Sequence, residues 1–254
     1  MENLKTETKI ISWNVNGIRA RLDAVKALVE KEQPDILCLQ EIKVKDSRPY
    51  LEAIPGYVGI ANTNATSPGH AGVAIYTRDG LLGDVDSGHI LADREGRILG
   101  MVIAGKRIVS AYIPADRRKK IGMLGNLAGW LGNCSCVVCG DFNTVSTDID
   151  YHCFIDGREN CLPLDKAMMA SFKDTLHLKD PYRDLYPLSR AYTYWPYTDW
   201  CRERDIGMRI DYTLVSENVS VVGAEILGGV MGSDHCPVSV TVCLNNNKGR
   251  EENG

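Results

Sequence analysis

The chain has 254 residues, of which 44% are hydrophobic and 24% are charged, which is the ordinary composition of a globular protein. This composition excludes a collagen-like or largely disordered chain, and no apolar run approaches the ~18 residues that a transmembrane helix needs. The formal charge of −4 argues against a nucleic-acid partner, because phosphate binding normally leaves an excess of Lys and Arg.

Short β-rich runs recur along the whole chain, each bounded by Gly, Pro, Asn or Asp, and such runs are typical of strands. In chain order, the predicted strands span residues 9–13, 35–40, 57–61, 72–77, 98–103, 107–113, 136–139, 210–215, 221–227 and 238–242.

Three helices are predicted between these strands. The clearest begins at Ile18, where apolar residues repeat every three or four positions, and it ends at Gln33-Pro34. The other two span residues 121–131 and 164–172. Strands mixed with helices, and strand pairs close enough for hairpins, favour a layered α/β fold with mixed sheets. No linker or repeat divides the chain, so we expect one domain over residues 9–244, with flexible ends at 1–8 and 245–254.

The nine cysteines are an odd number in a chain too long to be a small disulfide-stapled domain. The polar start, residues 1–8, does not resemble a signal peptide. We therefore expect free thiols and a cytoplasmic protein, nucleoid-associated if the source is a prokaryote.

Five of the apolar runs adjoin a small polar cluster. Together the clusters contain Asn14, Asn16, Glu41, Asp141, Asn143, Asp211, Asp234 and His235. Each of these residues alone is most often a turn former, but five such clusters need a common explanation. Buried carboxylates are costly to desolvate, so if the clusters converge, a hard divalent cation such as Mg²⁺ would neutralise them.

In this order, the segments resemble the endonuclease/exonuclease/phosphatase superfamily and, within it, the exonuclease III type of apurinic/apyrimidinic (AP) endonuclease. Gly-Asp-Phe-Asn at 140–143 and Ser-Asp-His-Cys-Pro at 233–237 are shared by the whole superfamily. Three segments are narrower and resemble the DNA-repair branch: Ser-Trp-Asn-Val-Asn-Gly-Ile-Arg-Ala at 12–20, Leu-Gln-Glu-Ile-Lys at 39–43 and Arg-Ile-Asp-Tyr at 209–212.

The resemblance covers residues 9–242 and implies a four-layered sandwich of two mixed β-sheets flanked by helices. It implies a Mg²⁺-dependent enzyme, with Mn²⁺ as the alternative metal, that cuts duplex DNA on the 5′ side of an abasic site. The products would carry 3′-hydroxyl and 5′-deoxyribose phosphate ends, and 3′→5′ exonuclease or 3′-end cleaning would accompany the cut. The expected partner is double-stranded DNA with abasic sites, bound by a monomer without contact to a membrane.

For the metal, the resemblance implies Glu41 as principal ligand, with Asn16 and Asp234 close by, directly or through water. Asp141 and Asn143 are additional candidates for the metal. All five side chains carry oxygen atoms, which Mg²⁺ prefers as ligands.

For catalysis, the resemblance implies that Asp141 is the general base, helped by Asn14 and by the asparagine of the same turn, Asn143. Asp211 would orient His235, whose imidazolium would bind the scissile phosphate; an adjacent carboxylate favours that charged form. Tyr112 would contact the phosphate or support the leaving group. Its alternative interpretation is a core aromatic at a strand end.

For DNA contact, the resemblance implies Arg19 near the first helix, and Arg117 and Arg118 in the basic run 117–120. A run of charges is more often only a solvated helix face. Four residues would line a small pocket for the extruded abasic sugar, with a packed aromatic loop as the alternative: Tyr194, Trp195, Met208 and Ile210.

Three departures from the family pattern weaken the expected grip on the duplex. Ala115 stands where the family often has an amide, Met208 replaces an aromatic, and Tyr112 and Asp141 lie only 29 positions apart. They also weaken the expected exonuclease processivity, and a flexible Met208 would make the sugar pocket less selective.

The excess of acidic over basic residues equals the number of acids in the predicted site. Without Glu41, Asp141, Asp211 and Asp234, acidic residues equal the 29 Lys plus Arg in number. Basic residues gathered on one side could therefore still face DNA, and we expect modest DNA affinity with a clear salt dependence.

Two other functions and one other site stay open. The chain could be a phosphoesterase acting on RNA, a nucleotide or a phospholipid, or a non-catalytic DNA-binding or redox interaction protein. The spacing of Cys134, Cys136 and Cys139, with His152 downstream, is a weak zinc pattern because the second ligand pair is poorly formed.

Overall fold

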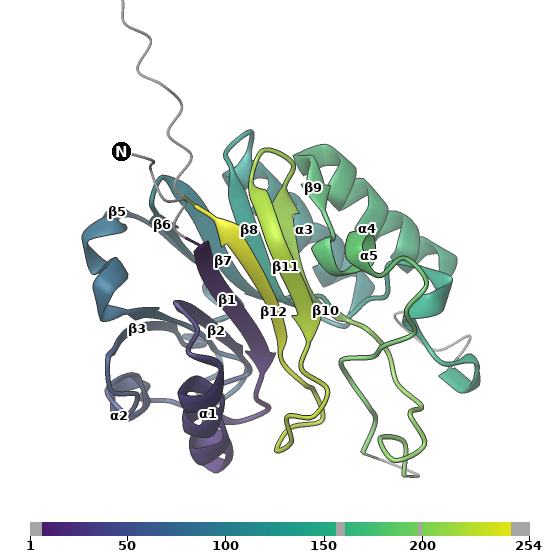
Figure 1. The fold of residues 1–254 in the computed structure, drawn as a ribbon, viewed down its shortest axis with the longest axis horizontal. Helices are drawn as coiled ribbons and strands as arrows, with labels where there is room; N and C mark the ends of the chain where they lie inside the picture. Colours follow the sequence, from purple (N-terminus) through teal and green to yellow (C-terminus); the bar gives the residue numbers. More distant parts are fainter. Residues whose placement is uncertain (1–6, 156–160, 198–199, 245–254) are drawn as a thin grey trace, which may run out of the picture.

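The computed structural model describes residues 7–155, 161–197 and 200–244, and it contains two facing six-stranded sheets (Figure 1). The first sheet has the strand order β11 (Ser220–Ile226), β12 (Val238–Cys243), β1 (Glu7–Asn14), β2 (Ile36–Gln40), β4 (Val73–Arg78) and β3 (Tyr57–Asn62). The second sheet has the order β5 (Val85–Ala92), β6 (Ile98–Ile103), β7 (Lys106–Tyr112), β8 (Cys136–Asp141), β10 (Asp211–Ser216) and β9 (Leu178–Lys179).

Each sheet contains one parallel pair among antiparallel neighbours. In the first sheet β1 runs parallel to β2, and helix α1 (Ile18–Glu32) connects them. In the second sheet β7 runs parallel to β8, and α3 (Arg117–Leu131) connects them. A parallel pair needs such a crossover, and both of its strands end at the same edge of the sheet.

Helices cover the outer faces of both sheets. Helix α1 packs on the first sheet through Ile18, Val25 and Leu28, whereas α3 and α4 (Pro163–Leu176) pack on the second. The remaining helical segments are α2 (Arg48–Leu51), α5 (Pro181–Leu185) and the 3₁₀ turns η1 (Asp79–Asp84), η2 (Asp148–Asp150) and η3 (Cys153–Ile155). The predicted four-layered sandwich of two mixed sheets flanked by helices is therefore confirmed.

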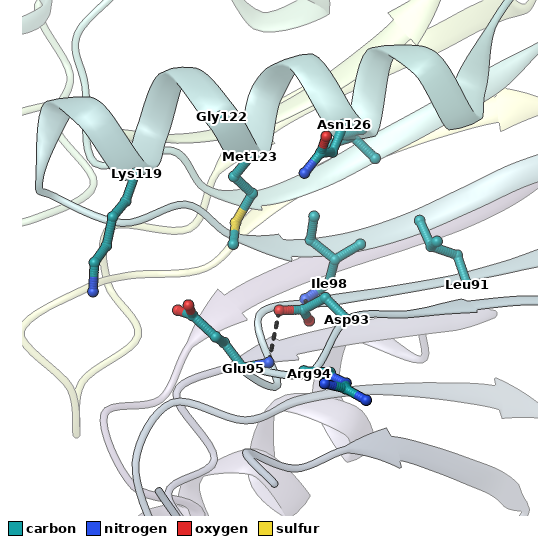
Figure 2. A pocket seen from close by; sticks show the side chains of 10 residues that line it. Leu91, Asp93, Arg94, Glu95, Ile98, Lys119, Gly122, Met123 and Asn126 are labelled. Carbon is teal, nitrogen blue, oxygen red and sulfur yellow. Dashed lines mark hydrogen bonds between the residues drawn. The ribbon is translucent and has the colours of Figure 1, made fainter. Parts of the chain in front are cut away.

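Helix α3 leaves a cleft of about 400 Å³ between itself and the turn that joins β5 to β6 (Figure 2). Leu91, Ile98 and Met123 form apolar walls, and Lys119 and Arg94 lie among its other lining residues. The cleft thus lies on the outer side of the second sheet.

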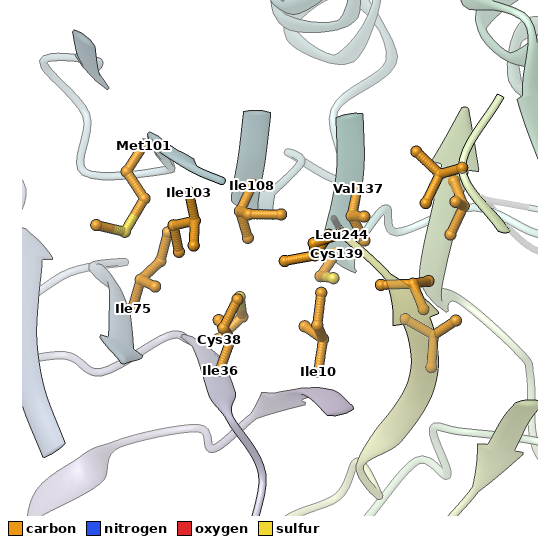
Figure 3. Packing of buried hydrophobic residues seen from close by; sticks show 14 of the residues in the cluster. Ile10, Ile36, Cys38, Ile75, Met101, Ile103, Ile108, Val137, Cys139 and Leu244 are labelled. Atoms are coloured by element: carbon orange, nitrogen blue, oxygen red, sulfur yellow. The ribbon is translucent and has the colours of Figure 1, made fainter. Parts of the chain in front are cut away.

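The core between the sheets is built from inward-facing residues of both (Figure 3). Ile10, Ile36 and Cys38 of the first sheet face Ile108 and Cys139 of the second, all with no exposed surface. Because each sheet is covered on both faces, its central strands are continuous apolar runs, which made them predictable.

Strand β1 and helix α3 begin earlier than predicted. Strand β1 begins at Glu7, paired with Cys243, so residues 7 and 8 belong to the sheet and not to the predicted flexible end. Helix α3 begins four residues earlier than predicted, because the Asp116 carboxylate caps it by accepting from Lys119 N at 3.0 Å. The predicted tail, residues 245–254, lies outside the described residues. Within the described part of the chain, every helix is too short or too polar to cross a bilayer.

Candidate active site

The ends of the two parallel strand pairs meet at one buried amide. The Asn14 Nδ2, at the end of β1, donates to Glu41 Oε1 at 2.8 Å and to Asp141 Oδ2 at 2.9 Å. Glu41 directly follows β2, and Asp141 is the last residue of β8. Asn14 and Asp141 are 0% and 1% exposed. One side chain therefore joins two carboxylates that come from different sheets.

A cationic group already occupies the oxygen atoms predicted to bind metal. The Lys43 Nζ lies 2.6 Å from Glu41 Oε2 and donates to Asn16 Oδ1 at 2.6 Å. The Asn16 Nδ2 donates in turn to Asp234 Oδ1 at 3.0 Å. The hydrogen bonds from Asn14 and Lys43 lower the pKa of Glu41 although burial opposes this shift. These oxygens therefore favour positive charge, and the donor set fits a hard divalent cation.

Glu41, Asp141 and His235 offer ligand atoms within 4.8 Å of one another, the only such group of three among the residues that the structure describes. His235 is the one nitrogen donor of the three, and a hard divalent cation prefers oxygen ligands. Burial would lower the pKa of its imidazole, but the Asp211 carboxylate, with Oδ2 2.8 Å from Nδ1, raises that pKa to about 10. Glu41 and Asp141 are therefore the oxygen ligands that this group offers.

The protonated imidazole faces the predicted general base. The His235 Nε2 lies 3.9 Å from Asp141 Oδ2. Burial raises the pKa of Asp141 to about 7, and the carboxylates of Asp211 and Glu41 act in the same direction against His235. A carboxyl group with a raised pKa is the better proton acceptor near neutral pH.

Tyr112 closes the other side of the cluster. It ends β7 and lies directly opposite Asp141 in the parallel register. Burial and the carboxylates of Glu41 and Asp141 raise the pKa of its phenol, so the hydroxyl stays protonated. The Arg97 guanidinium stacks 4.7 Å from the ring centroid, a contact that no sequence pattern indicated.

Backbone geometry is unusual around these side chains. Asn16, Glu41, Lys43 and Asn143 all have φ between 46° and 52°, the left-handed region that non-glycine residues seldom adopt. Gly140 has φ 145°, and a Cβ on it would lie 1.8 Å from the carbonyl oxygen of Ala111. Strained backbone of this kind often marks functional sites.

Asn143 supports Asp141 from the same turn. Its main-chain N donates to Asp141 Oδ1 at 2.8 Å, and its Nδ2 donates to Asp141 Oδ2 at 3.3 Å and to Ile113 O at 2.9 Å. The Nζ of Lys120, fully buried, donates to Asn143 O at 2.6 Å. The Asn143 side-chain amide thus orients the Asp141 carboxylate. Because this amide is used between Asp141 and Ile113, the geometry does not favour Asn143 as a metal ligand.

The basic run 117–120 at the start of α3 does not present one continuous charged surface. Lys120 is buried, and the guanidinium of Arg117 binds the buried Asp165 at 3.1 Å. Arg118 and Lys119 are exposed, and Lys119 extends beside the cleft of Figure 2. The helix buries one residue in each turn, which explains why adjacent charges take different roles.

Three of the four residues predicted for the sugar pocket lie together. Tyr194 forms isolated β-bridges with Met208 and with His235, and its ring centroid lies 4.8 Å from that of His235. Met208 and Ile210 are buried in the same apolar cluster as Val145. This cluster borders the imidazole of the candidate active site.

Trp195, the fourth predicted pocket residue, is not brought together with them. Its indole Nε1 donates to Asp205 Oδ1 at 3.0 Å, and the Arg202 guanidinium stacks 4.6 Å from its ring. It lines a groove of about 610 Å³ that adjoins Asp234 and contains the exposed Trp200. Because neighbours in an extended segment point to opposite sides, Tyr194 and Trp195 cannot line the same pocket.

Arginines near the candidate site differ in their surroundings. Arg19, predicted to contact DNA, is exposed at the start of α1. Arg202 instead donates to the main-chain carbonyls of Ser233 and Val230, at 2.8 and 2.7 Å. Arg209, in the Arg-Ile-Asp-Tyr segment, is 1% exposed and binds the carboxylates of Asp150 and Asp180.

All nine cysteines are free thiols, and within the described ranges none of them belongs to a group of three metal-binding side chains. The zinc interpretation therefore has no support. Cys136 and Cys139 are buried in β8, where they act as small hydrophobic residues.

Both the sequence and the fold of this chain are similar to those of known proteins. Residues 11–235 match the model of the Endonuclease/Exonuclease/phosphatase family. The chain is 33% identical to the Exodeoxyribonuclease of Bacillus subtilis (strain 168), over 92% of this chain and 99% of that protein. It is 30% identical to the DNA repair nuclease APEX1 of Danio rerio, over 93% of this chain and 82% of that protein. Its fold is similar to that of the AP endonuclease LMAP from Leishmania major, with a TM-score of 0.85 at 24% identity, covering 93% and 88% of the two chains.

Proposed function

Because the chain belongs to the endonuclease/exonuclease/phosphatase family, as a nuclease of the exonuclease III type, we propose that it cuts duplex DNA 5′ to abasic sites in DNA repair. The cut leaves a 3′-hydroxyl and a 5′-deoxyribose phosphate, and 3′→5′ trimming accompanies it. The observation that carries the proposal is the junction at Asn14, which holds Glu41 and Asp141 together beside the Asp211–His235 pair.

Glu41 would hold the metal ion as its principal ligand, with Asn16 and Asp234 bordering the site. We propose Mg²⁺, with Mn²⁺ as a substitute, because the available donors are oxygens. When bound, the ion supplies positive charge that compensates the charge on the phosphate oxygens in the transition state. An ion bound at Glu41 Oε2 would replace the Lys43 ammonium, whose side chain is 37% exposed.

Asp141 accepts the proton of the attacking water. Asn14 and Asn143 hold its carboxylate by three side-chain and main-chain donors, so its free lone pairs keep a fixed direction. Its raised pKa matches it to proton abstraction near neutral pH.

His235 and Tyr112 supply the fixed donors. The imidazolium, held by Asp211, donates from Nε2 to a non-bridging phosphate oxygen, and the phenol of Tyr112 donates to the same phosphate or to the leaving oxygen. Preorganised donors of this kind stabilise developing charge without reorganising during the reaction.

The apolar cluster beside His235 suits a sugar that lacks its base. Tyr194, Met208 and Ile210 offer an apolar wall next to the phosphate donors, where a normal nucleotide would have to place a polar base. Exposed Arg19 and Arg118 would contact backbone phosphates outside it. We further propose that the protein works as a monomer in the cytoplasm, in line with its nine free thiols.

The test uses labelled duplexes that carry an abasic site, no damage or a blocked 3′ end, each with and without EDTA. A single Mg²⁺-dependent nick 5′ to the abasic site is expected. Asp141→Asn should slow the cut by about 10²–10⁴-fold while duplex binding persists. Absence of a metal-dependent nick, or faster cleavage of RNA or a nucleotide ester, would overturn the proposal.

A further inference from the structure

The Asp211 carboxylate has one side-chain partner, and this leaves its orientation to the main chain. Its Oδ2 lies 2.8 Å from His235 Nδ1. Its Oδ1 is buried without a hydrogen-bond partner in the part of the chain that the structure describes. Among the described residues, His235 is the one side chain that hydrogen-bonds this carboxylate, so its direction also depends on where the backbone of residue 211 lies.

On one side that backbone is held by β8, where Asp211 pairs with Asp141 and Phe142 N donates to Ile210 O at 2.9 Å; on the other side a single hydroxyl holds it. The Thr193 Oγ1 accepts from the main-chain N of Ile210 and of Asp211, both at 3.1 Å, and donates to Met208 O at 3.4 Å. Thr193 has no exposed surface. Strand β9 pairs with β10 only at its far end, at Val215 and Ser216, so the hydroxyl takes the place of a neighbouring strand at Asp211.

The backbone of the same residue holds the other member of the pair. The main-chain N of Cys236, next to His235, donates to Thr193 O at 2.8 Å, and the main-chain N of Thr193 donates to Met208 O at 2.9 Å. Thr193 therefore touches both the segment that carries Asp211 and the segment that carries His235.

We propose that Thr193 is a positioning residue that sets the distance and direction of the Asp211–His235 hydrogen bond. Its role in cleavage rests on the proposed function, since His235 acts there as the phosphate donor. The geometry of the hydrogen bond itself can be measured without a substrate.

Three variants separate the hydroxyl from the rest of the side chain. Thr193→Val keeps the shape but leaves two buried amides without an acceptor. Thr193→Ser keeps the hydroxyl and loses the methyl group. Thr77→Val is the matched control, because Thr77 is 2% exposed and its Oγ1 has no hydrogen-bond partner among the described residues. Thr193→Ala introduces no new atoms and replaces the valine variant if that one fails to fold.

Two measurements are compared across the variants. The first is the single-turnover rate constant for nicking an abasic duplex, with the DNA Kd from its concentration dependence. The second is the downfield ¹H resonance of the His235 Nδ1 proton in ¹⁵N-histidine-labelled protein, assigned by its loss in His235→Asn. The resonance reports the hydrogen bond to Asp211 directly, whereas a general loss of stability would leave its position unchanged.

We expect Thr193→Val to lower the rate constant by about 10²-fold with little change in Kd, since a misplaced catalytic donor costs that order. The His235 resonance should move upfield or broaden, while Thr193→Ser and Thr77→Val should resemble the unmodified protein in both measurements. A wild-type resonance and rate in Thr193→Val would overturn the inference, as would an equal loss in Thr193→Ser. If the unmodified protein fails to cut abasic DNA, the proposed function falls, but the resonances still decide the role of Thr193.

Discussion

Replacing Arg209 by methionine would remove the guanidinium that joins two buried carboxylates next to the candidate active site. Its Nε and Nη2 donate to Asp150 at 2.7 and 3.2 Å, and its Nη1 and Nη2 donate to Asp180 at 3.2 and 2.7 Å. Asp150 lies in η2, and Asp180 caps α5. The arginine thereby ties two distant turns to the segment that leads into Asp211.

The magnitude follows from burial. Arg209, Asp150 and Asp180 are 1%, 0% and 7% exposed, so solvent does not screen the charges. Asp150 would keep the guanidinium of Arg183 at 2.5 Å, but Asp180 would lose its one ion-pair partner among the described residues. Removing one member of a buried pair costs about 3–5 kcal/mol, because it leaves an uncompensated charge. For a chain of this size the melting temperature should fall by roughly 6–20 °C.

Calorimetric melting at pH 7 tests this expectation. The control is Arg48→Met, since the Arg48–Asp46 pair has side chains 82% and 51% exposed and should contribute nothing measurable. A second comparison places Arg209→Met in an Asp150→Asn, Asp180→Asn background, where its cost should shrink because no carboxylate charge remains. If Arg209→Met lowers the melting temperature no more than Arg48→Met does, the argument from buried charge is refuted.

Three further predictions concern pH, metal and backbone. Burial would raise the pKa of Asp150, but Arg209 and Arg183 lower it below the value of about 3.9 in the unfolded chain. The ionised Asp150 therefore stabilises the fold above about pH 4, and this stabilisation is lost as the pH falls through the folded pKa. The loss of stability in acid should be smaller in Asp150→Asn, and an unchanged pH dependence of melting in that variant would contradict the expectation. Glu41→Gln should weaken Mg²⁺ binding, measured by titration calorimetry, and an unchanged Kd would mean that the metal lies elsewhere. Gly140→Ala should fail to fold or lose activity because its Cβ would overlap Ala111 O, and a stable, active variant would show that the strand pair can shift.

Much of the fold could be predicted because its signals are local. Central strands such as β2 and β8 are covered on both faces, and their apolar runs stand out without any knowledge of neighbours. The two-residue strand β9 and the irregular strand β5 carry no such run and were not predicted. The start of α3 was misplaced because its cap is a single hydrogen bond to Asp116.

Some residues of the candidate site could likewise be predicted from the sequence, and others could not. Its acids and amides adjoin strong strands, so Asn14, Glu41 and Asp141 could be named as a set from their positions in the sequence. The roles of Lys120 and Thr193 could not be predicted, because each depends on a partner far along the chain. Neither residue differs in type or local pattern from one at the surface.

The amino-acid sequence by itself determined the strand pattern, the polar residues at the strand ends and the resemblance to a phosphodiester-cleaving family. The strand pattern follows from periodicity, and the polar residues and the resemblance follow from residue types within short segments. None of these requires a contact between distant parts of the chain. Only the tertiary structure decided that the Asn14 amide joins Glu41 to Asp141, that Trp195 leaves the pocket formed beside Tyr194, and that the basic start of α3 is partly buried. The physical reason is that hydrogen bonds and burial depend on distances between segments, and those distances exist only once the two sheets have packed together.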